Sequence, residues 1–565
     1  MSIRLWRVRR SADDTPAVAV NDLLKCLGIS ATLSHVRNTL SGHPDYPSLL
    51  SLAESLPEWG VHAEGVKGTI GDLSDVDFPS IVMLENGKHS QTFAVLENMM
   101  DSVVTINHPA DGHQTLSLKD FGKLWSGVLL RTTPSENGFE RDFVRHRKEE
   151  RFAFAKRMVI MLGLPLLFLM AFAYGIAHVE SPGMLIPLVL VKICGFAVCG
   201  VMVADTLGGS NLMSSLCPTG RVINCHRVMR SPAGKLFGIS MSDWGLLYFG
   251  GSLLSLLAAL YFGQFRNDLM LLGILGLFTL PYTVFSVVYQ TFVIRSWCWM
   301  CLVVMGLFWA EFYLMYDILQ QFVGTGFSGI VFPMSILIGF GAAVVGWASL
   351  KHIIQSAGKA GSLEQQLTRL RRQPEYIHYQ LSKTGNSEMG HFPIEVEIGP
   401  KDAKLTISAV VNPLCGHCWQ AFNHLDQLIS LGMGQVKGTI RFLVTPNRDE
   451  EAPTKAEEFL DREVSLRILA YAVNGRRELV HKALTDWFSP NDTLSTGKFD
   501  RWQQRYHDID EVTRRTAVGV LDQQMQWARS HEIIGTPTLY FNGHRLPYGL
   551  QLEDLKLYVM RLLSG

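Results

Sequence analysis

The hydrophobic and polar positions divide the 565-residue chain into three parts. In the first part, apolar and polar residues alternate in short runs up to about residue 140. The stretches AVAVNDLLKCLGI and SLLSLAESLPEWG have helical spacing, whereas PSIVML, TFAVLEN and SVVTINHP indicate strands. We therefore predict a soluble, mixed α/β domain over residues 1–140.

The middle part, residues 150–350, contains six apolar runs, each long enough to cross a bilayer, which takes about 20 residues. This pattern predicts an all-α membrane region. Lys192 lies in the second run and Glu311 in the fifth. An intramembrane charge indicates either a functional site or an interior structural contact, and the sequence favours neither. The runs lie near 158–178, 184–204, 244–263, 269–288, 299–319 and 327–350.

The last part returns to the pattern of a soluble domain. Residues 351–400 are polar and charged and are expected to form a linker. Over 401–565, LTISAVVN, GTIRFLVT and TLYF indicate strands, and Asn542-Gly543 predicts a hairpin turn. The final stretch, LEDLKLYVMRLL, predicts a helix with its apolar residues on one face, at Leu552, Leu555, Val559 and Leu562.

The composition narrows the classes of function. The chain has 51 basic and 51 acidic residues, which argues against nucleic-acid binding through bulk positive charge. Its hydrophobic fraction of 47% agrees with a part in lipid. The opening MSIRLWRVRR is basic but lacks an apolar core and a cleavage site, so no secretory signal peptide is expected.

The nine cysteines are too few for a disulfide scaffold in a chain of this length. Six of them fall into three close pairs, and these pairs are the first candidates for functional residues. The pairs are Cys217 with Cys225, Cys298 with Cys301, and Cys415 with Cys418. Cys194 and Cys199 lie inside an apolar run and are interpreted as packing residues.

The CxxC in NPLCGHCWQAF comes after a predicted strand and opens a predicted helix. The helix dipole and the free N–H groups favour the thiolate of Cys415, and Cys418 lies one turn on, where it can close a disulfide. A zinc half-site is the alternative, but no second CxxC or matching His pair lies nearby. This motif therefore predicts a redox pair.

Near the end of the chain, IIGTPTLYF resembles the thioredoxin fold, in which a Thr-cis-Pro step packs beside the CxxC. Thr536 and Pro537 match that step. The helical stretch between the two motifs resembles the insertion of the periplasmic disulfide oxidants of this superfamily. The resemblance covers roughly 395–565 and implies an α/β thioredoxin-like domain.

The CxxC in RSWCWMCLVV opens an apolar helix at the predicted membrane edge. The simpler interpretation of Cys298 and Cys301 is a pair of small buried thiols, with Trp297 and Trp299 as interfacial anchors. The segments CPTGRVINCHRV, SPAGKLFGIS and WCWMC, in this order among helices, resemble the vitamin K epoxide reductase family. The match covers roughly 180–350 and implies a four-helix bundle with flanking helices. Cys217, Cys225, Ser231 and the Phe237-Gly238 step carry it.

Disulfides exchange by thiolate attack, so electrons can pass from one pair to the next. The family resemblance implies a relay from reduced client proteins through Cys415–Cys418, Cys217–Cys225 and Cys298–Cys301 to a membrane quinone, either menaquinone or ubiquinone. In that relay Cys217 faces the soluble domain, Cys225 pairs with Cys298, and Cys301 attacks the quinone. No metal is expected.

The N-terminal segments HSQTFAVLEN, VVTINHP and LSLKDFGKLWSGVLL resemble papain-like peptidases that trim bacteriocin leaders. That family needs a Cys at a helix start, a His opening the FAVL-like strand and an Asp before the Pro. Here Thr92 and His108 occupy the last two positions, and Cys26 lies too far along its helix. The implied domain is degenerate and non-catalytic. His89 is a candidate for a displaced base, but the sequence favours a solvated loop histidine. A peptidase-containing exporter is unlikely, because the sequence has no G-x-x-x-x-G-K-[ST].

Six spans place both soluble parts and the thiol pairs on one side of the membrane. The loop near Cys217 and both flanks are basic, which favours the cytoplasm, whereas disulfide formation favours the periplasmic face of a bacterial inner membrane. We expect a quinone-dependent thiol oxidase on the periplasmic face. A thiol-driven quinone reductase and a peptide-binding or transport module with vestigial cysteines are the alternatives.

Overall fold

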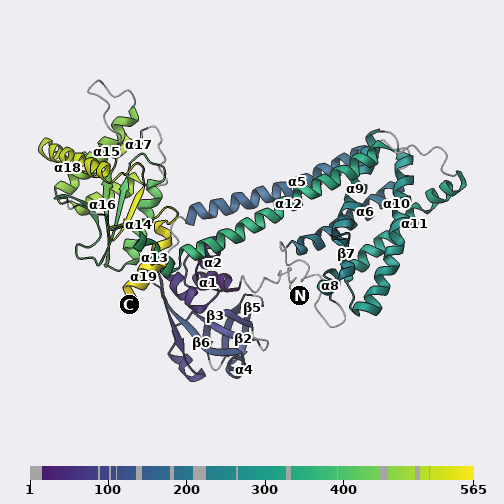
Figure 1. Ribbon diagram of the computed structural model, residues 1–565. Coiled ribbons are helices and arrows are strands. Elements are labelled where there is room, and N and C mark those ends of the chain that lie inside the picture. The colour runs from purple at the N-terminus through teal and green to yellow at the C-terminus, as the bar shows by residue number, and fades with distance from the viewer. Residues whose placement is uncertain are drawn as a thin grey trace.

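The computed structural model is elongated, with a helical region at one end and two folded domains at the other (Figure 1). Two long helices, α5 (Phe143–Ile176) and α12 (Met334–Arg371), extend from the helical region toward the folded domains. The described residues are 15–86, 90–100, 103–109, 111–134, 143–177, 183–207, 224–262, 265–325, 333–387, 389–390, 392–444, 456–489, 497–507 and 509–564.

The N-terminal domain is built on a six-stranded antiparallel sheet in the order β1-β6-β2-β3-β4-β5. The three strands expected from the alternating pattern are confirmed as β2, β3 and β4. Its strands are β1 (Val61–Lys67), β2 (Ser80–Asn86), β3 (Ser90–Met100), β4 (Val103–His108), β5 (Gly112–Ser117) and β6 (Trp125–Pro134). Its helices are α1 (Thr15–Cys26), α2 (Leu33–Ser41), α3 (Leu49–Ser55) and α4 (Leu118–Leu124), with a 3₁₀ turn at Leu56–Trp59.

All six expected apolar runs are confirmed as helices long and apolar enough to cross a membrane. Helix α9 packs against α12, α6, α10 and α5, so it is the centre of the bundle. The remaining helices are α6 (Leu185–Thr206), α9 (Met241–Phe262), α10 (Phe265–Val288) and α11 (Trp299–Thr325). Shorter elements are α8 (Cys225–Met229), the hairpin β7 (Lys235–Leu236) and β8 (Ile239–Ser240), and the π-helical turn η5 (Tyr289–Ile294).

The two charges found inside the apolar runs meet in the middle of this bundle. The Lys192 Nζ atom lies 2.5 Å from Glu311 Oε1 and donates to Ser252 Oγ at 3.2 Å. The Tyr248 hydroxyl donates to the same carboxylate at 2.8 Å. Both charged side chains are fully buried, so each neutralises the other where neither could be solvated. This arrangement favours the structural interpretation of these charges over the functional one.

The segment expected as a linker is helical for much of its length, because α12 continues without interruption to Arg371 and α13 (Pro374–Lys383) comes next. Near its end, Arg369 Nε donates to the backbone oxygen of Ser41 at 2.8 Å. Arg372 Nη2 lies 2.5 Å from Glu553 Oε1 in the C-terminal domain. One helix therefore connects the bundle with both folded domains.

The C-terminal domain has a five-stranded sheet in the order β13-β12-β10-β11-β9, with β10 and β11 parallel and the other pairs antiparallel. The expected strands are confirmed, and Asn542 and Gly543 form the hairpin turn with positive φ. Its strands are β9 (Val396–Ile398), β10 (Leu405–Val411), β11 (Val436–Phe442), β12 (Thr538–Phe541) and β13 (His544–Arg545). Its helices are α14 (Cys418–Leu431), α15 (Ala456–Val473), α16 (Arg477–Trp487), α17 (Lys498–Arg505), α18 (Glu511–Ser530) and α19 (Leu555–Ser564).

The closing helix differs from its prediction in one residue. Leu552, Leu555 and Val559 are buried, but Leu562 is 45% exposed. Leu562 lies in the last turn of α19, which the domain core covers less than the turns that carry Leu555 and Val559. The predicted apolar face therefore does not extend to the end of the chain.

Ion pairs join the two folded domains. Lys556 Nζ lies 2.9 Å from Glu58 Oε1, and Arg561 Nη2 lies 2.8 Å from Asp45 Oδ2 and 3.1 Å from Glu54 Oε2. His43 joins the same cluster through Glu54 Oε2 at 3.0 Å. His43, Asp45 and Glu54 have the geometry of a metal site, but Arg561 already neutralises the two carboxylates. The cluster serves as an interdomain contact.

Candidate functional site

The soluble CxxC lies at the junction of β10 and α14. Asn412 fixes the loop: its Oδ1 accepts the Leu414 N–H at 2.8 Å, and its Nδ2 donates to Leu443 O at 3.0 Å. Cys418 is the first residue of α14. The Cys415 thiol donates to the Thr536 carbonyl at 3.3 Å, and the Thr536–Pro537 peptide bond is cis. Residues more than 100 positions apart thus form one thiol site.

The two thiols of this site differ in exposure. Both are free, but Cys415 is partly exposed and Cys418 is fully buried. Burial, reinforced by the hydrogen bond with Cys415, raises the pKa of the Cys418 thiol to about 12. The attacking role predicted for Cys415 needs an accessible thiolate, and Cys415 is the more exposed of the two thiols; the two roles stay a prediction.

The second CxxC lies where α10 gives way to α11. The π-helical turn η5 and Arg295, which has a left-handed backbone conformation with φ of 54°, end α10 and reverse the chain before α11 begins. Gln290 Oε1 accepts the Cys298 N–H at 2.8 Å, and Gln290 O accepts the Ser296 N–H at 3.2 Å. Cys298 and Cys301 are joined by a disulfide. Cys298 is fully buried, whereas Cys301 is partly exposed.

Cys225 belongs to the same apolar cluster as Cys298, together with Met202, Val228 and Ile294. It is the first residue of α8, it is buried, and it is disulfide-bonded. The backbone N–H of Asn224 donates to the Trp297 carbonyl at 3.1 Å, so the two segments are hydrogen-bonded next to their cysteines. Cys217 lies outside the described residues. The exchange of Cys225 with Cys298 stays a prediction.

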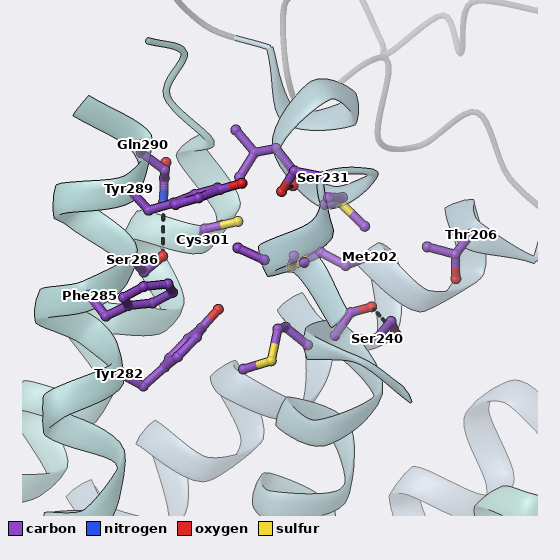
Figure 2. Close-up of a pocket in the computed structure, with 16 residues that line it drawn as sticks. Met202, Thr206, Ser231, Ser240, Tyr282, Phe285, Ser286, Tyr289, Gln290 and Cys301 are labelled. Atoms are coloured by element: carbon purple, nitrogen blue, oxygen red, sulfur yellow. Dashed lines mark hydrogen bonds between the residues drawn. The ribbon is translucent and has the colours of Figure 1, made fainter. Parts of the chain in front are cut away.

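A cavity opens beside Cys301 and has about 510 Å³ of empty space, including the part open to the surroundings. Tyr282, Phe285 and Tyr289 form an aromatic wall on one side of it, with Cys301 next to Tyr289 (Figure 2). The polar lining comes from hydroxyl and amide groups on Thr206, Ser231, Ser240, Ser242, Ser286 and Gln290. In the described residues, one wall is therefore flat and aromatic and the opposite one is hydroxyl-rich.

These residues fit a quinone. A quinone has a flat apolar ring, which aromatic side chains can stack on, and two carbonyl oxygens, which accept hydrogen bonds. The sulfur that a quinone would oxidise, that of Cys301, lines the same cavity. Among the described lining residues the polar groups are hydroxyls, one amide and the disulfide-bonded Cys301, without His or carboxylate, so this part of the lining does not resemble a metal site.

The supporting residues predicted from the sequence lie in different places. Ser231 lines the cavity, and its hydroxyl donates to Val228 O at 2.7 Å. Phe237 forms the turn of the β7–β8 hairpin with positive φ, is 88% exposed, and is not among the lining residues. Cys199 is buried against Gly245, as its packing role requires, whereas Cys194 is exposed on α6, so its predicted packing role is wrong.

The N-terminal domain lacks the peptidase arrangement in its described residues. Helix α1 begins with Thr15, not a cysteine, and Cys26 is its last residue. The nearest partner of the Cys26 thiol is Glu97, and burial together with this carboxylate raises the pKa of Cys26. Thr92 is partly buried, its Oγ1 has no hydrogen-bond partner, and His108 pairs with Asp111. His89 lies outside the described residues.

Sequence reasoning missed most of the cavity wall. Tyr282, Phe285 and Tyr289 lie in an apolar run, where aromatic residues do not stand out from lipid-facing ones. Gln290 was the available signal, because an amide inside an apolar run needs a buried partner. Nothing in the sequence predicted the π-helical turn that brings Gln290 within hydrogen-bond distance of Cys298.

Three family models match three successive parts of the chain. Residues 7–137 match the Peptidase C39 family, 186–316 match the Vitamin K epoxide reductase family, and 393–560 match a Thioredoxin model. Each agrees with the resemblance seen in its own segment. The expected peptidase-like domain, helical membrane bundle and thioredoxin-like domain are therefore confirmed.

Individual proteins resemble only pieces of the chain. The "Probable functional amyloid protease FapD" of Pseudomonas aeruginosa is 28% identical over 83 residues, which are 15% of this chain and 36% of that protein's length. A double glycine motif protease from an AMS/PCAT transporter, crystallised with the leader peptide, is 20% identical with a TM-score of 0.21, covering 23% of this chain and 91% of its own. A periplasmic thioredoxin-like protein of Salmonella enterica serovar Typhimurium is 16% identical with a TM-score of 0.25. The match covers 34% of this chain and 97% of that protein's chain.

The vitamin K epoxide reductase match lies over the apolar helices, and the thioredoxin match contains the soluble CxxC. Together they show that a region similar to the Vitamin K epoxide reductase family, which lies over helices long and apolar enough to cross a membrane, is followed in this chain by a thioredoxin-like region.

Proposed function

We propose that the protein is a quinone-dependent thiol oxidase that forms disulfides in client proteins. Electrons leave a client dithiol through Cys415–Cys418, continue through Cys217–Cys225 and Cys298–Cys301, and reach menaquinone or ubiquinone. For each disulfide formed, two S–H bonds break and two electrons and two protons convert the quinone to a quinol.

The observation that carries this proposal is the position of Cys301. It is bonded to Cys298, shares an apolar cluster with Cys225, and lines an aromatic cavity. A pair of merely packed thiols needs no such cavity. Ser231 supports the cavity from the hydroxyl-rich side, and Thr536 and Pro537 support Cys415 in the soluble domain. Phe237, on an exposed hairpin turn, is proposed to anchor the bundle at the membrane surface.

We place the thiol pairs at the periplasmic face of a bacterial inner membrane, because disulfides persist in oxidising compartments. The proposed division of the chain is a peptidase-like domain at 1–140, the membrane region at 150–350 with its reductase-like bundle from about 180, a connecting segment at 351–400, and the thioredoxin-like domain at 401–565. The peptidase-like domain, without a Cys–His pair in its described residues, is proposed to bind rather than cleave.

The test uses the full-length protein in detergent, reduced and anaerobic. A short-chain ubiquinone is added, and the thiol states of Cys415 and Cys418 are followed by alkylation and mass spectrometry. We expect oxidation in the wild-type protein and none in Cys301→Ala. Cys199→Ala is the matched control, because it removes a buried bundle thiol outside the three pairs. If quinone leaves both thiols reduced in the wild-type protein, the proposal fails.

The two alternatives differ from the oxidase in what they do with a client. A thiol-driven quinone reductase reduces quinone with a small dithiol but leaves a reduced, unfolded client protein unchanged. A peptide-binding or transport module keeps its function in Cys415→Ala. The oxidase loses client oxidation in the same variant.

A further inference from the structure

Asp243 lies just behind the hydroxyl-rich wall of the cavity and has no role in the proposed thiol relay. It is the third residue of α9, and its side chain is only 3% exposed. It is not among the residues that line the cavity, but Ser240 and Ser242 are. The Ser240 hydroxyl donates to Asp243 Oδ2 at 2.7 Å and lies 2.9 Å from the Ser242 hydroxyl. A buried carboxylate is thus one hydrogen bond from the cavity.

The other side of the same carboxylate faces α12. Lys351 Nζ lies 2.6 Å from Asp243 Oδ2, and Trp347 Nε1 donates to Oδ1 at 3.1 Å. The Lys351 side chain is 32% exposed, so it reaches the outside of the bundle while its ammonium group contacts the carboxylate. Lys351, Asp243 and Ser240 therefore form a continuous line of exchangeable protons from the outside of the bundle to the cavity.

We propose that Asp243 is a proton-relay residue for the acceptor that oxidises Cys301. This inference rests on the proposed function, because conversion of a quinone to a quinol needs a proton at each of two carbonyl oxygens. The aromatic wall supplies no acid at neutral pH other than tyrosine hydroxyls, which hold their protons tightly. The line through Ser240 ends at the cavity, across from Tyr282, Phe285 and Tyr289 (Figure 2).

Protons and electrons balance in this step. The Cys298 and Cys301 thiols lose two protons and two electrons and form one S–S bond. Ser240 gives its hydroxyl proton to an acceptor oxygen and takes one from Asp243, which receives one from Lys351. Lys351 then regains a proton from water. The other carbonyl oxygen takes one of the two thiol protons, and the second thiol proton is released to water, so the two electrons and two protons lost by the thiols equal those gained by the acceptor. Asp243 acts through Ser240 and does not itself touch the acceptor.

The test compares four variants of the full-length protein in detergent. Asp243→Asn keeps the size but replaces one accepting oxygen with an amide nitrogen and cannot carry a proton, and Asp243→Glu restores the carboxyl group. Lys351→Met removes the outer end of the line. Trp347→Phe is the matched control, because it removes a hydrogen bond to the same carboxylate without interrupting the line.

Each reduced variant is mixed with a short-chain ubiquinone, and Cys298–Cys301 oxidation is followed in a single turnover by alkylation. Loss of an acid–base group typically costs a factor of 10² to 10⁴, so we expect Asp243→Asn to slow oxidation about 100-fold. Lys351→Met should be slowed as well, Asp243→Glu should recover most of the rate, and Trp347→Phe should match the wild type. Two further readouts should not change: quinone affinity, and the equilibrium of Cys298–Cys301 with glutathione in the absence of quinone.

An Asp243→Asn variant that is oxidised at the wild-type rate overturns the inference. So does a pattern in which Trp347→Phe and Asp243→Glu are both as slow as Asp243→Asn, or in which the glutathione equilibrium shifts along with the rate, because these results indicate a structural role. Failure of the proposed function looks different, since the wild-type protein itself is then not oxidised by quinone.

Discussion

The soluble and the membrane CxxC have the same spacing, but the exposed cysteine is the first one in the soluble site and the second one in the membrane site. In the soluble site the first cysteine, Cys415, is accessible and Cys418 is buried. In the membrane site the first cysteine, Cys298, is buried and Cys301 lines the cavity. Both sites stand at a helix start, so helix position alone does not decide which sulfur is presented. The surrounding elements decide it, and each site exposes the sulfur that reacts with a partner in the proposed relay.

The two sites are fixed by similar means. In each, a side-chain amide accepts a backbone N–H: Asn412 from Leu414, and Gln290 from Cys298. The difference lies in the segment that covers each pair. The cis-Pro loop covers the soluble pair and leaves Cys415 open at its edge, whereas α8 packs over Cys298 and leaves Cys301 toward the cavity. Two CxxC motifs of the same spacing therefore expose different sulfurs, the first in the soluble site and the second in the membrane site.

The largest expected effect is loss of one sulfur from either site. Cys415→Ala and Cys301→Ala should each reduce quinone-dependent oxidation of a client protein to the background rate, because a relay has no parallel route. The measurement is oxygen-free quinone reduction with a reduced client. Addition of the isolated wild-type thioredoxin-like domain is expected to rescue Cys415→Ala only; rescue of Cys301→Ala would contradict the opposite roles of the two sites.

The order of alkylation in the reduced protein tests which cysteine of each pair is more accessible. We expect a small, membrane-permeable maleimide to label Cys415 before Cys418 and Cys301 before Cys298, because exposure controls access. Time-resolved mass spectrometry of the four peptides gives the order. Full labelling after unfolding in denaturant is the control. Equal rates for Cys298 and Cys301 would remove the contrast.

The pH dependence of Cys418 sharpens the same contrast. Because burial raises its pKa to about 12, the remaining thiol in Cys415→Ala should react slowly with iodoacetamide, at a rate that still rises at pH 10. In unfolded protein the same thiol should level off near its ordinary pKa of about 8.5. The raised pKa also means that the folded, reduced domain holds this proton more tightly than the unfolded chain. Its stability should therefore fall as the pH rises from about 9 toward 12.

The smallest effect is expected from the amide anchor of the membrane site. Gln290→Leu leaves the buried Cys298 N–H without its acceptor, which costs about 1–3 kcal/mol of stability. Thermal unfolding in detergent measures it. Ser286→Ala is the matched control, because Ser286 accepts from the amide nitrogen of Gln290 and leaves the carbonyl oxygen in place. A loss of stability as large in Ser286→Ala as in Gln290→Leu would show that the Cys298 contact is not the cause.

Much of the architecture could be predicted from local patterns. The six apolar runs, the strands on either side of Asn542-Gly543 and the CxxC before α14 are features of short segments, which depend mainly on spacing. The difference in exposure between Cys298 and Cys301 could not be predicted, because the burial of one sulfur depends on how α8 and η5 pack around it in three dimensions. The Lys192–Glu311 pair likewise joins residues 119 positions apart.

The long helix α12 governs how often the two sites meet. Its 38 residues span about 57 Å at 1.5 Å per residue, nearly twice the hydrocarbon thickness of about 30 Å. A stiff helix of this length holds the soluble CxxC within a narrow range of distances from the bundle, whereas a flexible chain would spread it through a large volume. The effective concentration of one dithiol at the other is then set by the bending of a single helix. Gly358 and Gly361, which lie beyond the apolar run at 327–350 and have no neighbour within 4 Å, lower the stiffness of the outer part of that helix.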